Sequence, residues 1–168
     1  MRVVLLGPES TGKSTLATAL AQQYKGIAIP EYARTYVEHL RHPYTYADVE
    51  AIAHRQIDEW HRQWLAPWVF YDTNLIITKI WFLEVYHRCP AWVEEALVRC
   101  LPDAYLICRP DLPFVEDPVR ENPHRREYLL QCYLREVEQQ RVPYAFVGGQ
   151  GEERLQCASE ALATLFCA

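Results

Sequence analysis

Residues 7–14 read GPESTGKS and match the pattern G-x-x-x-x-G-K-[ST] at every fixed position. An apolar run precedes this segment and an amphipathic segment follows it, which is the strand–loop–helix context that the pattern requires. The two glycines permit a turn in which successive backbone N–H groups point at phosphate oxygens, and the start of the helix adds partial positive charge. A chance glycine turn before a helix is the weaker interpretation, because strand, loop and helix are all in place.

The residue types of this loop predict a site for ATP and Mg²⁺. Lys13 can reach the β- and γ-phosphates, and the hydroxyl of Ser14 can ligate Mg²⁺. The residues expected to bind the nucleotide are Gly7, Glu9, Ser10, Thr11, Gly12, Lys13, Ser14 and Thr15. The loop alone does not distinguish a kinase from an ATPase or a molecular switch. A GTPase is disfavoured, because the chain has no N-K-x-D motif for guanine.

Two carboxylates lie where buried strands are expected to end. Asp72 follows the apolar run VFY, and a carboxylate there can hold a water of the Mg²⁺ shell, although a turn-forming or helix-capping role is the alternative. Glu31 follows the apolar segment GIAI and can accept a proton from a substrate hydroxyl. Its alternative is an acid at a helix start that pairs with Arg34, worth a few tenths of a kcal/mol. Which carboxylate is the base, Glu31 or Asp72, stays open.

A basic cluster occurs in DPVRENPHRR, residues 117–126, after a strand and a proline-rich loop. Loops that carry arginines can close over ATP, neutralise developing charge and exclude water. The alternative is a solvated basic face at a helix start, but positive charge there opposes the helix dipole. We therefore expect Arg120, and after it Arg126, to act on the transferred phosphoryl group, with a weaker expectation for Arg125.

The remaining residues that could bind a ligand or a metal are mostly expected to be structural. The five tryptophans are interpreted as core, and only Tyr32 and Phe114, which lie beside candidate polar residues, are given a role in ligand binding. The histidines form no metal-ligand pattern. The six cysteines contain no C-x-x-C pair, so we expect reduced, packed thiols rather than zinc ligands or disulfides.

The elements that must position these residues alternate between short apolar runs and longer amphipathic segments. We expect strands at residues 2–6, 26–29, 68–72, 104–108 and 144–149. We expect helices at residues 13–24, 46–65, 75–87, 91–101, 124–140 and after Gly151. This alternation predicts an α/β fold, a parallel five-stranded sheet flanked by helices, with ligands at the carboxyl ends of the strands. Nothing marks a domain boundary, so residues 1–168 are expected to form one domain.

The composition of the chain argues against two classes of binding partner, nucleic acids and membranes. The chain has 17 basic and 22 acidic residues, a formal net charge of −5, which argues against nucleic acid as the main partner. No apolar run approaches the ~20 residues that cross a bilayer, and the short apolar N-terminus lacks the features of a signal peptide. We therefore expect no membrane partner and a cytoplasmic location. The oligomeric state is left open.

Several motifs, taken in order, resemble a known family. GPESTGKST, EYAR (residues 31–34), DTNLIITK (72–79) and YLICRPDLPFVEDPVREN (105–122) are similar to the ribosylnicotinamide kinase domain of the NadR family, within the AAA-like P-loop ATP-binding proteins. The similarity extends over essentially the whole chain. It implies a nucleoside-kinase-like P-loop NTPase fold with an Arg-rich lid, and transfer of phosphate from ATP to the 5′-hydroxyl of nicotinamide riboside, giving nicotinamide mononucleotide.

The resemblance also assigns roles to residues. It implies catalysis by Lys13, Glu31, Asp72, Arg120 and Arg126, metal binding by Ser14 and Asp72, and substrate contacts by Glu31, Tyr32, Arg34, Asn74 and Phe114. Asn74 and Phe114 depart from the family, whose better-known members have aspartate and often tryptophan there. A kinase for another nucleoside or small metabolite is therefore one alternative, and a nucleotide-dependent regulatory ATP-binding module is another. The family's fused DNA-binding and adenylyltransferase domains have no counterpart here, so we expect a stand-alone kinase or one with separate partners.

Overall fold

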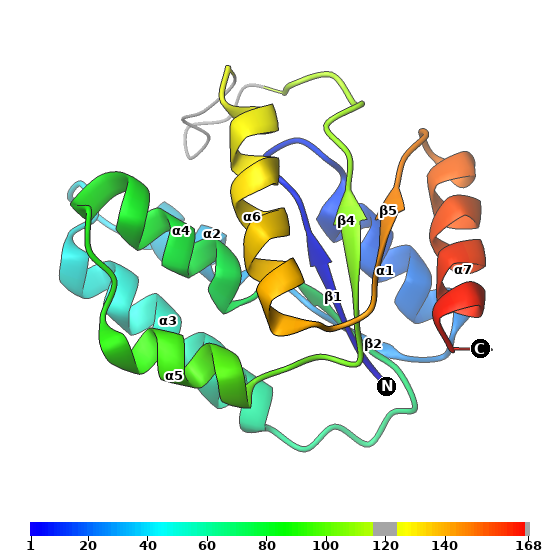
Figure 1. Cartoon of the computed structure of the whole chain (residues 1–168), viewed down its shortest axis with the longest axis horizontal. Coiled ribbons are helices and arrows are strands. Elements are labelled where there is room, and N and C mark those ends of the chain that lie inside the picture. Colours follow the sequence, from blue (N-terminus) through cyan, green and yellow to red (C-terminus); the bar gives the residue numbers. More distant parts are fainter. Residues whose placement is uncertain (116–123, 167–168) are drawn as a thin grey trace.

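The computed structural model describes residues 1–115 and 124–166, and these form an α/β fold (Figure 1). The strands are β1 (Arg2–Leu6), β2 (Ile27–Ile29), β3 (Val69–Asp72), β4 (Ala104–Cys108) and β5 (Tyr144–Val147). The helices are α1 (Lys13–Gln23), α2 (Tyr32–His39), α3 (Tyr46–His61), α4 (Leu75–Tyr86), α5 (Ala91–Arg99), α6 (Arg126–Gln140) and α7 (Glu152–Phe166).

All the strand pairs are parallel, in the order β2-β3-β1-β4-β5. The register places Leu5 of β1 beside Asp72 of β3 and beside Leu106 of β4. Because β1 is the central strand, the loop after it emerges between the ends of β3 and β4. The predicted parallel five-stranded sheet is confirmed, and so is the expected strand content.

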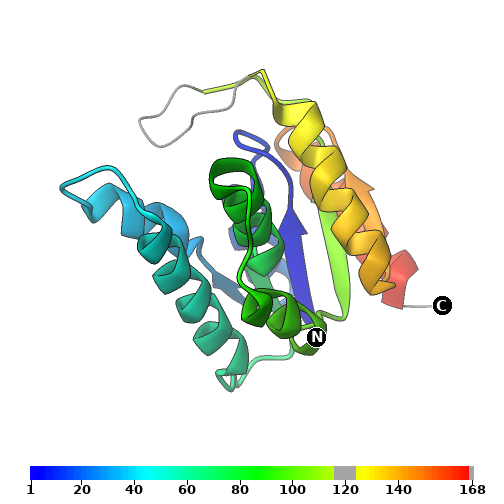
Figure 2. The same ribbon diagram turned by 60° about the vertical axis from the view of Figure 1, so that its left-hand side comes forward.

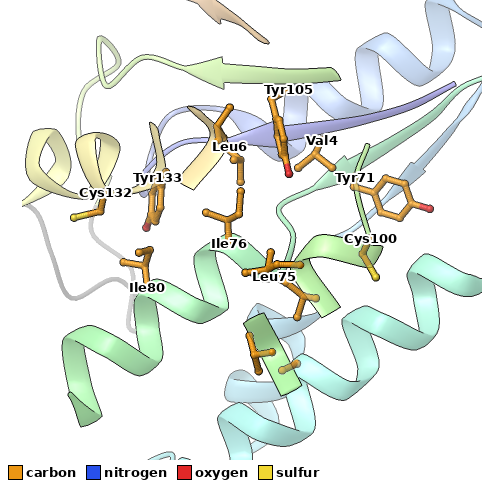
Figure 3. Packing of buried hydrophobic residues seen from close by; sticks show 14 of the residues in the cluster. Val4, Leu6, Tyr71, Leu75, Ile76, Ile80, Cys100, Tyr105, Cys132 and Tyr133 are labelled. Atoms are coloured by element: carbon orange, nitrogen blue, oxygen red, sulfur yellow. The ribbon is translucent and has the colours of Figure 1, made fainter. Parts of the chain in front are cut away.

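Helices cover both faces of the sheet, as a parallel sheet requires (Figures 1 and 2). Along β1, Val3 and Leu5 face a cluster formed with α1 and α7, whereas Val4 and Leu6 face a larger cluster formed with α3, α4, α5 and α6. Figure 3 shows the second cluster, in which Val4 and Leu6 lie across from Ile76 of α4. This packing fixes the strand ends, and therefore the residues that follow them. No helix within residues 1–115 and 124–166 is long and apolar enough to cross a membrane.

Two elements differ from the sequence expectation. The helix α2 was foreseen only in the alternative interpretation of Glu31 as an acid at a helix start, and none of its residues is fully buried. The helix α3 begins with a capping box between Thr45 and Asp48, but ends at His61 rather than at residue 65. The helix ends because Arg62 adopts an extended conformation. Beyond it, Trp64 still packs against the core, whereas Leu65 is fully exposed.

The end of α1 is formed by Lys25 and Gly26. Lys25, not Gly26, takes the left-handed conformation, with φ of 52°. The N–H of Gly26 donates to the carbonyl of Ala21 at 2.8 Å, which completes a Schellman-type helix end. Gly26 is needed for another reason, because a Cβ there would lie 2.5 Å from the carbonyl oxygen of Trp68.

Candidate active site

The loop between β1 and α1 depends on its two glycines. Gly7 has φ of 152°, and a Cβ there would lie 2.6 Å from the carbonyl oxygen of Cys108 on β4. Gly12 has φ of 73° at the N-cap of α1, and a Cβ there would lie 3.1 Å from Leu112. Side chains at these positions would be strained and would clash, so the phosphate-loop pattern and the packing of β4 require the same residues.

Two side chains of this loop donate hydrogen bonds to the same backbone carbonyl of the loop. The buried hydroxyl of Thr11 and the ammonium of Lys13 each donate to the carbonyl of Pro8, both at 2.9 Å. Ser14 and Thr15 are exposed in the first turn of α1. Within the described residues, Lys13 is therefore held over the loop by its bond to the Pro8 carbonyl, which a phosphate oxygen can replace with a stronger bond between two charged groups.

The turn after β3 holds a buried carboxylate in strained surroundings. Asp72 is 4% exposed, and its Oδ1 has no hydrogen-bond partner among the described residues. The next residue, Thr73, has φ of 75°, a costly conformation for a β-branched side chain. A buried, unsatisfied carboxylate oxygen is expensive, and strain next to it is typical of functional sites. Because Asp72 lies beside Leu5 in the sheet, it ends β3 next to the start of the phosphate loop.

Asn74 fixes the direction of this turn. Its Oδ1 accepts from the N–H of Ile76 at 3.0 Å and caps α4, while its Nδ2 donates to the hydroxyl of Tyr105 at 3.2 Å. Tyr105 in turn donates to Gln140 at 2.6 Å. The predicted substrate residue Asn74 thus lies at the site, but both ends of its amide already have partners within the protein.

The residues present fit a magnesium ion. Mg²⁺ is usually held by one or two carboxylates together with phosphate oxygens and water, rather than by a full cage of protein ligands. The unsatisfied Oδ1 of Asp72 and the exposed hydroxyl of Ser14 meet that requirement. In the part of the chain that the structure describes, no group of three or more His, Cys, Asp or Glu side chains offers an alternative metal site.

Glu31 stands at the end of β2, on the far side of β3 from the phosphate loop. It is the N-cap residue of α2, but its side chain makes no capping hydrogen bond within the described chain. Burial raises the pKa of its carboxyl group, Asp72 adds to the rise, and Lys13 opposes it. The three charges therefore act on one another, and the raised pKa makes Glu31 a better proton acceptor near neutral pH.

A small cavity of about 40 Å³ lies beside Asp72, whereas Glu31 is not part of its lining, although both chain neighbours of Glu31 are. Its lining includes the predicted residues Tyr32, Asp72 and Asn74. It also includes residues that the sequence did not single out as site residues, namely Ile29, Pro30, Gln56, Glu59, Trp60, Tyr71, Thr73, Leu75 and Cys100. Trp60 belonged to the expected core stripe of α3, and only the packing of α3 over β2 and β3 shows that this stripe also borders the site. Arg34 lies outside the lining and is paired with Glu38 at 2.9 Å.

Arg126 contacts the phosphate loop from the other side. Its guanidinium donates to the carbonyl of Leu112 at 2.9 Å and to that of Ser10 at 3.2 Å. Burial lowers its pKa, and its Nε has no partner among the described residues. Arg125 points elsewhere, to Glu84 on α4. Of the predicted arginines Arg125 and Arg126, both of which the structure describes, Arg126 is therefore the one beside the phosphate loop.

Two other predicted residues belong to the segment before Arg126. Phe114 is half-buried, and its neighbour Val115 exchanges hydrogen bonds with the Ser10 side chain at 3.1 and 3.4 Å. Phe114 thus lies near the phosphate loop rather than in the lining of the cavity. Arg120 lies outside the described residues.

Comparison with known proteins identifies the family. The family model described as an AAA domain matches residues 2–154. The chain belongs to this family. Among curated proteins, it is similar to the trifunctional NAD biosynthesis/regulator protein NadR of Salmonella typhimurium, 27% identical, and of Escherichia coli, 29% identical, over 124 residues. Each match covers 70% of this chain and 30% of the relative, so the chain spans less than a third of those proteins.

Solved structures show the same fold. The chain is similar to NadR in complex with NR, with a TM-score of 0.84 and 21% identity over 99% of this chain and 52% of that one. It also resembles thymidylate kinase from Ehrlichia chaffeensis, with a TM-score of 0.66 and 10% identity over 98% of each chain. The resemblance to the NadR family and the nucleoside-kinase-like P-loop fold are therefore confirmed. One domain over residues 1–168 remains a prediction.

Proposed function

We propose that the chain is an ATP-dependent kinase of a small molecule, and that it phosphorylates the 5′-hydroxyl of nicotinamide riboside. The observation that carries the proposal is the arrangement of three charged groups at the ends of adjacent strands. Lys13 follows β1, Asp72 ends β3 and Glu31 follows β2. A cavity is lined by Asp72 and by Pro30 and Tyr32, the two chain neighbours of Glu31. A phosphate donor at β1 and an acceptor at β2 and β3 would meet at this edge of the sheet.

Each group has a distinct role in this proposal. Backbone N–H groups of the phosphate loop and Lys13 hold the β- and γ-phosphates, and Arg126 stabilises the negative charge that is spread over the transferred group. Asp72 and Ser14 would hold Mg²⁺, which would supply positive charge against the phosphates. Glu31 orients the acceptor hydroxyl and takes its proton.

The donor side is supported by the phosphate loop and by the family. NadR has been crystallised with NAD and AMP-PNP, an ATP analogue, and the present chain matches that structure with a TM-score of 0.78 and 19% identity. The choice of nicotinamide riboside is supported by the NadR complex with NR. The low identity means that this choice of acceptor must be tested directly on this chain.

A kinase for a different nucleoside is the second candidate, and Asn74 favours it. Its amide already bonds to Ile76 and Tyr105, so one donor and one acceptor position remain for the acceptor molecule, and the side chain carries no negative charge. The acceptor would then be selected by the aromatic lining of the cavity, including Trp60 and Tyr71.

An ADP-release assay with Mg·ATP and a panel of nucleosides tests the proposal. Saturable turnover with nicotinamide riboside, above a control without acceptor, supports it. Turnover with another nucleoside alone supports the second candidate. No acceptor-dependent turnover, with intact ATP binding, contradicts both and favours a regulatory ATP-binding module.

A further inference from the structure

Arg154, near the start of α7, is a buried cation that the proposed reaction does not use. Only 4% of this residue is exposed. Its Nε donates to the carbonyl of Gly149 at 2.9 Å, and its Nη2 pairs with the carboxylate of Asp111. The same carboxylate accepts from the N–H of Gly149 at 2.8 Å. Arg154 and Asp111 therefore form an ion pair, and both side chains also hydrogen-bond to the backbone of Gly149.

These contacts join two loops far apart in the sequence. Asp111 belongs to the loop after β4, and Gly149 to the loop after β5, with φ of 87°. Nη2 of Arg154 also lies 3.5 Å from the carbonyl oxygen of Arg109, in the first of these loops. The ion pair thus sets the separation of the loops at the carboxyl ends of β4 and β5.

The same group borders the phosphate loop. A Cβ at Gly12 would lie 3.9 Å from Cδ of Arg154 and 3.1 Å from Leu112, which follows Asp111. In addition, burial raises the pKa of the Cys108 thiol to about 11, against the lowering influence of Lys13 and Arg154. Arg154 therefore lies close to Gly12, at the N-terminus of α1.

Packing alone does not account for an arginine here. A buried ion pair is often no more stabilising than apolar side chains of the same volume. Nη1 of Arg154 is also buried without a hydrogen-bond partner in the described part of the chain, which is unfavourable. We therefore infer that the planar guanidinium group of Arg154 serves to fix the positions of the two loops relative to each other.

We propose that Arg154 is a positioning residue which, with Asp111, holds these two loops so that they receive the base end of the nucleotide. The proposal rests on the proposed function, because it requires ATP at the phosphate loop. With Asp72 and Glu31 occupying the β3 and β2 side, the base of a nucleotide bound at β1 extends toward β4 and β5. Arg154 contacts the two loops, and residues of these loops would contact the base.

The test compares two probes by calorimetry in the presence of Mg²⁺. AMP-PNP carries the base, whereas inorganic tripolyphosphate occupies only the phosphate loop. We expect Arg154→Lys and Asp111→Asn each to weaken AMP-PNP binding about tenfold, equivalent to ~1.4 kcal/mol, and to leave tripolyphosphate binding unchanged. The double variant should lose little more than either single variant, because the two residues act as one unit.

Lys79→Met is the matched control. Lys79 is also a partly buried cation, paired with Glu136 at 2.9 Å and with Glu94 at 3.5 Å, on helices away from the two loops. This variant should lower thermal stability without changing the affinity for AMP-PNP. Equal weakening of both probes, or unchanged AMP-PNP binding in both loop variants, overturns the positioning role. A wild-type chain that binds neither probe overturns the proposed ATP site as well.

Discussion

Replacement of Glu31 by glutamine tests which carboxylate acts as the base. The change keeps the shape of the side chain, removes its charge, and disturbs little else, because Glu31 makes no capping hydrogen bond in the described chain. General-base catalysis contributes about 10²- to 10⁴-fold to a rate. We therefore expect Glu31→Gln to lower kcat by that factor, about 2.7 to 5.4 kcal/mol in activation free energy. The KM for ATP should hardly change.

The pH dependence gives a second measure of the same residue. Burial raises the pKa of Glu31 above its ordinary value of 4.5, so wild-type kcat should fall as the pH drops through the raised pKa. This acid limb should be absent in Glu31→Gln. The assay is steady-state ADP release from pH 5 to 9 with saturating acceptor, and Asp58→Asn, at an exposed position on α3, is the control.

Stability should change in the opposite direction to activity. A carboxyl whose pKa is raised in the folded state binds its proton more tightly there than in the unfolded chain. Its ionisation therefore destabilises the fold above the raised pKa, and this penalty disappears below pH 4.5. Glu31→Gln should melt at a higher temperature than wild type at pH 8, and the difference should vanish near pH 4. A kcat within threefold of wild type, with the acid limb retained, would refute Glu31 as the base.

Three further substitutions have expected outcomes. Asp72→Asn should raise the Mg²⁺ concentration needed for half-maximal activity at least tenfold, without lowering the melting temperature, because Oδ1 has no hydrogen bond in the described chain to lose. Arg126→Ala should lower kcat about 10²- to 10³-fold while AMP-PNP still binds by calorimetry. Tyr105→Phe should lower the free energy of unfolding in urea by about 1 to 3 kcal/mol, since it leaves the amides of Asn74 and Gln140 without their shared partner. An unchanged value in any of these measurements contradicts the role assigned to that residue.

The parts of the site that local sequence determines were predictable. The phosphate loop follows from residue types at fixed spacing, and the structure places both glycines in conformations that require glycine. The carboxyl-end positions of Asp72 and Glu31 follow from the apolar runs before them. Parallel pairing then brings both residues to the same edge of the sheet.

The parts that depend on long-range packing were not predictable. Trp60 looked like core because its helical stripe is apolar, and only the docking of α3 on the sheet shows that it lines the cavity. Arg154 pairs with a residue 43 positions away, and no local pattern marks such a contact. The early end of α3 follows from the extended conformation of Arg62, which no residue pattern in the sequence marks.

The most direct test of the proposed function is ADP release with Mg·ATP and nicotinamide riboside, in wild type and in Lys13→Ala. Lys13 contributes only the single contact with Pro8 to the described fold, so its loss should spare stability while it removes the charge that faces the phosphates. We predict saturable, stoichiometric turnover in wild type, with nicotinamide mononucleotide as product, and loss of turnover in the variant. A rate that does not depend on nicotinamide riboside, or that survives Lys13→Ala, would contradict the proposal.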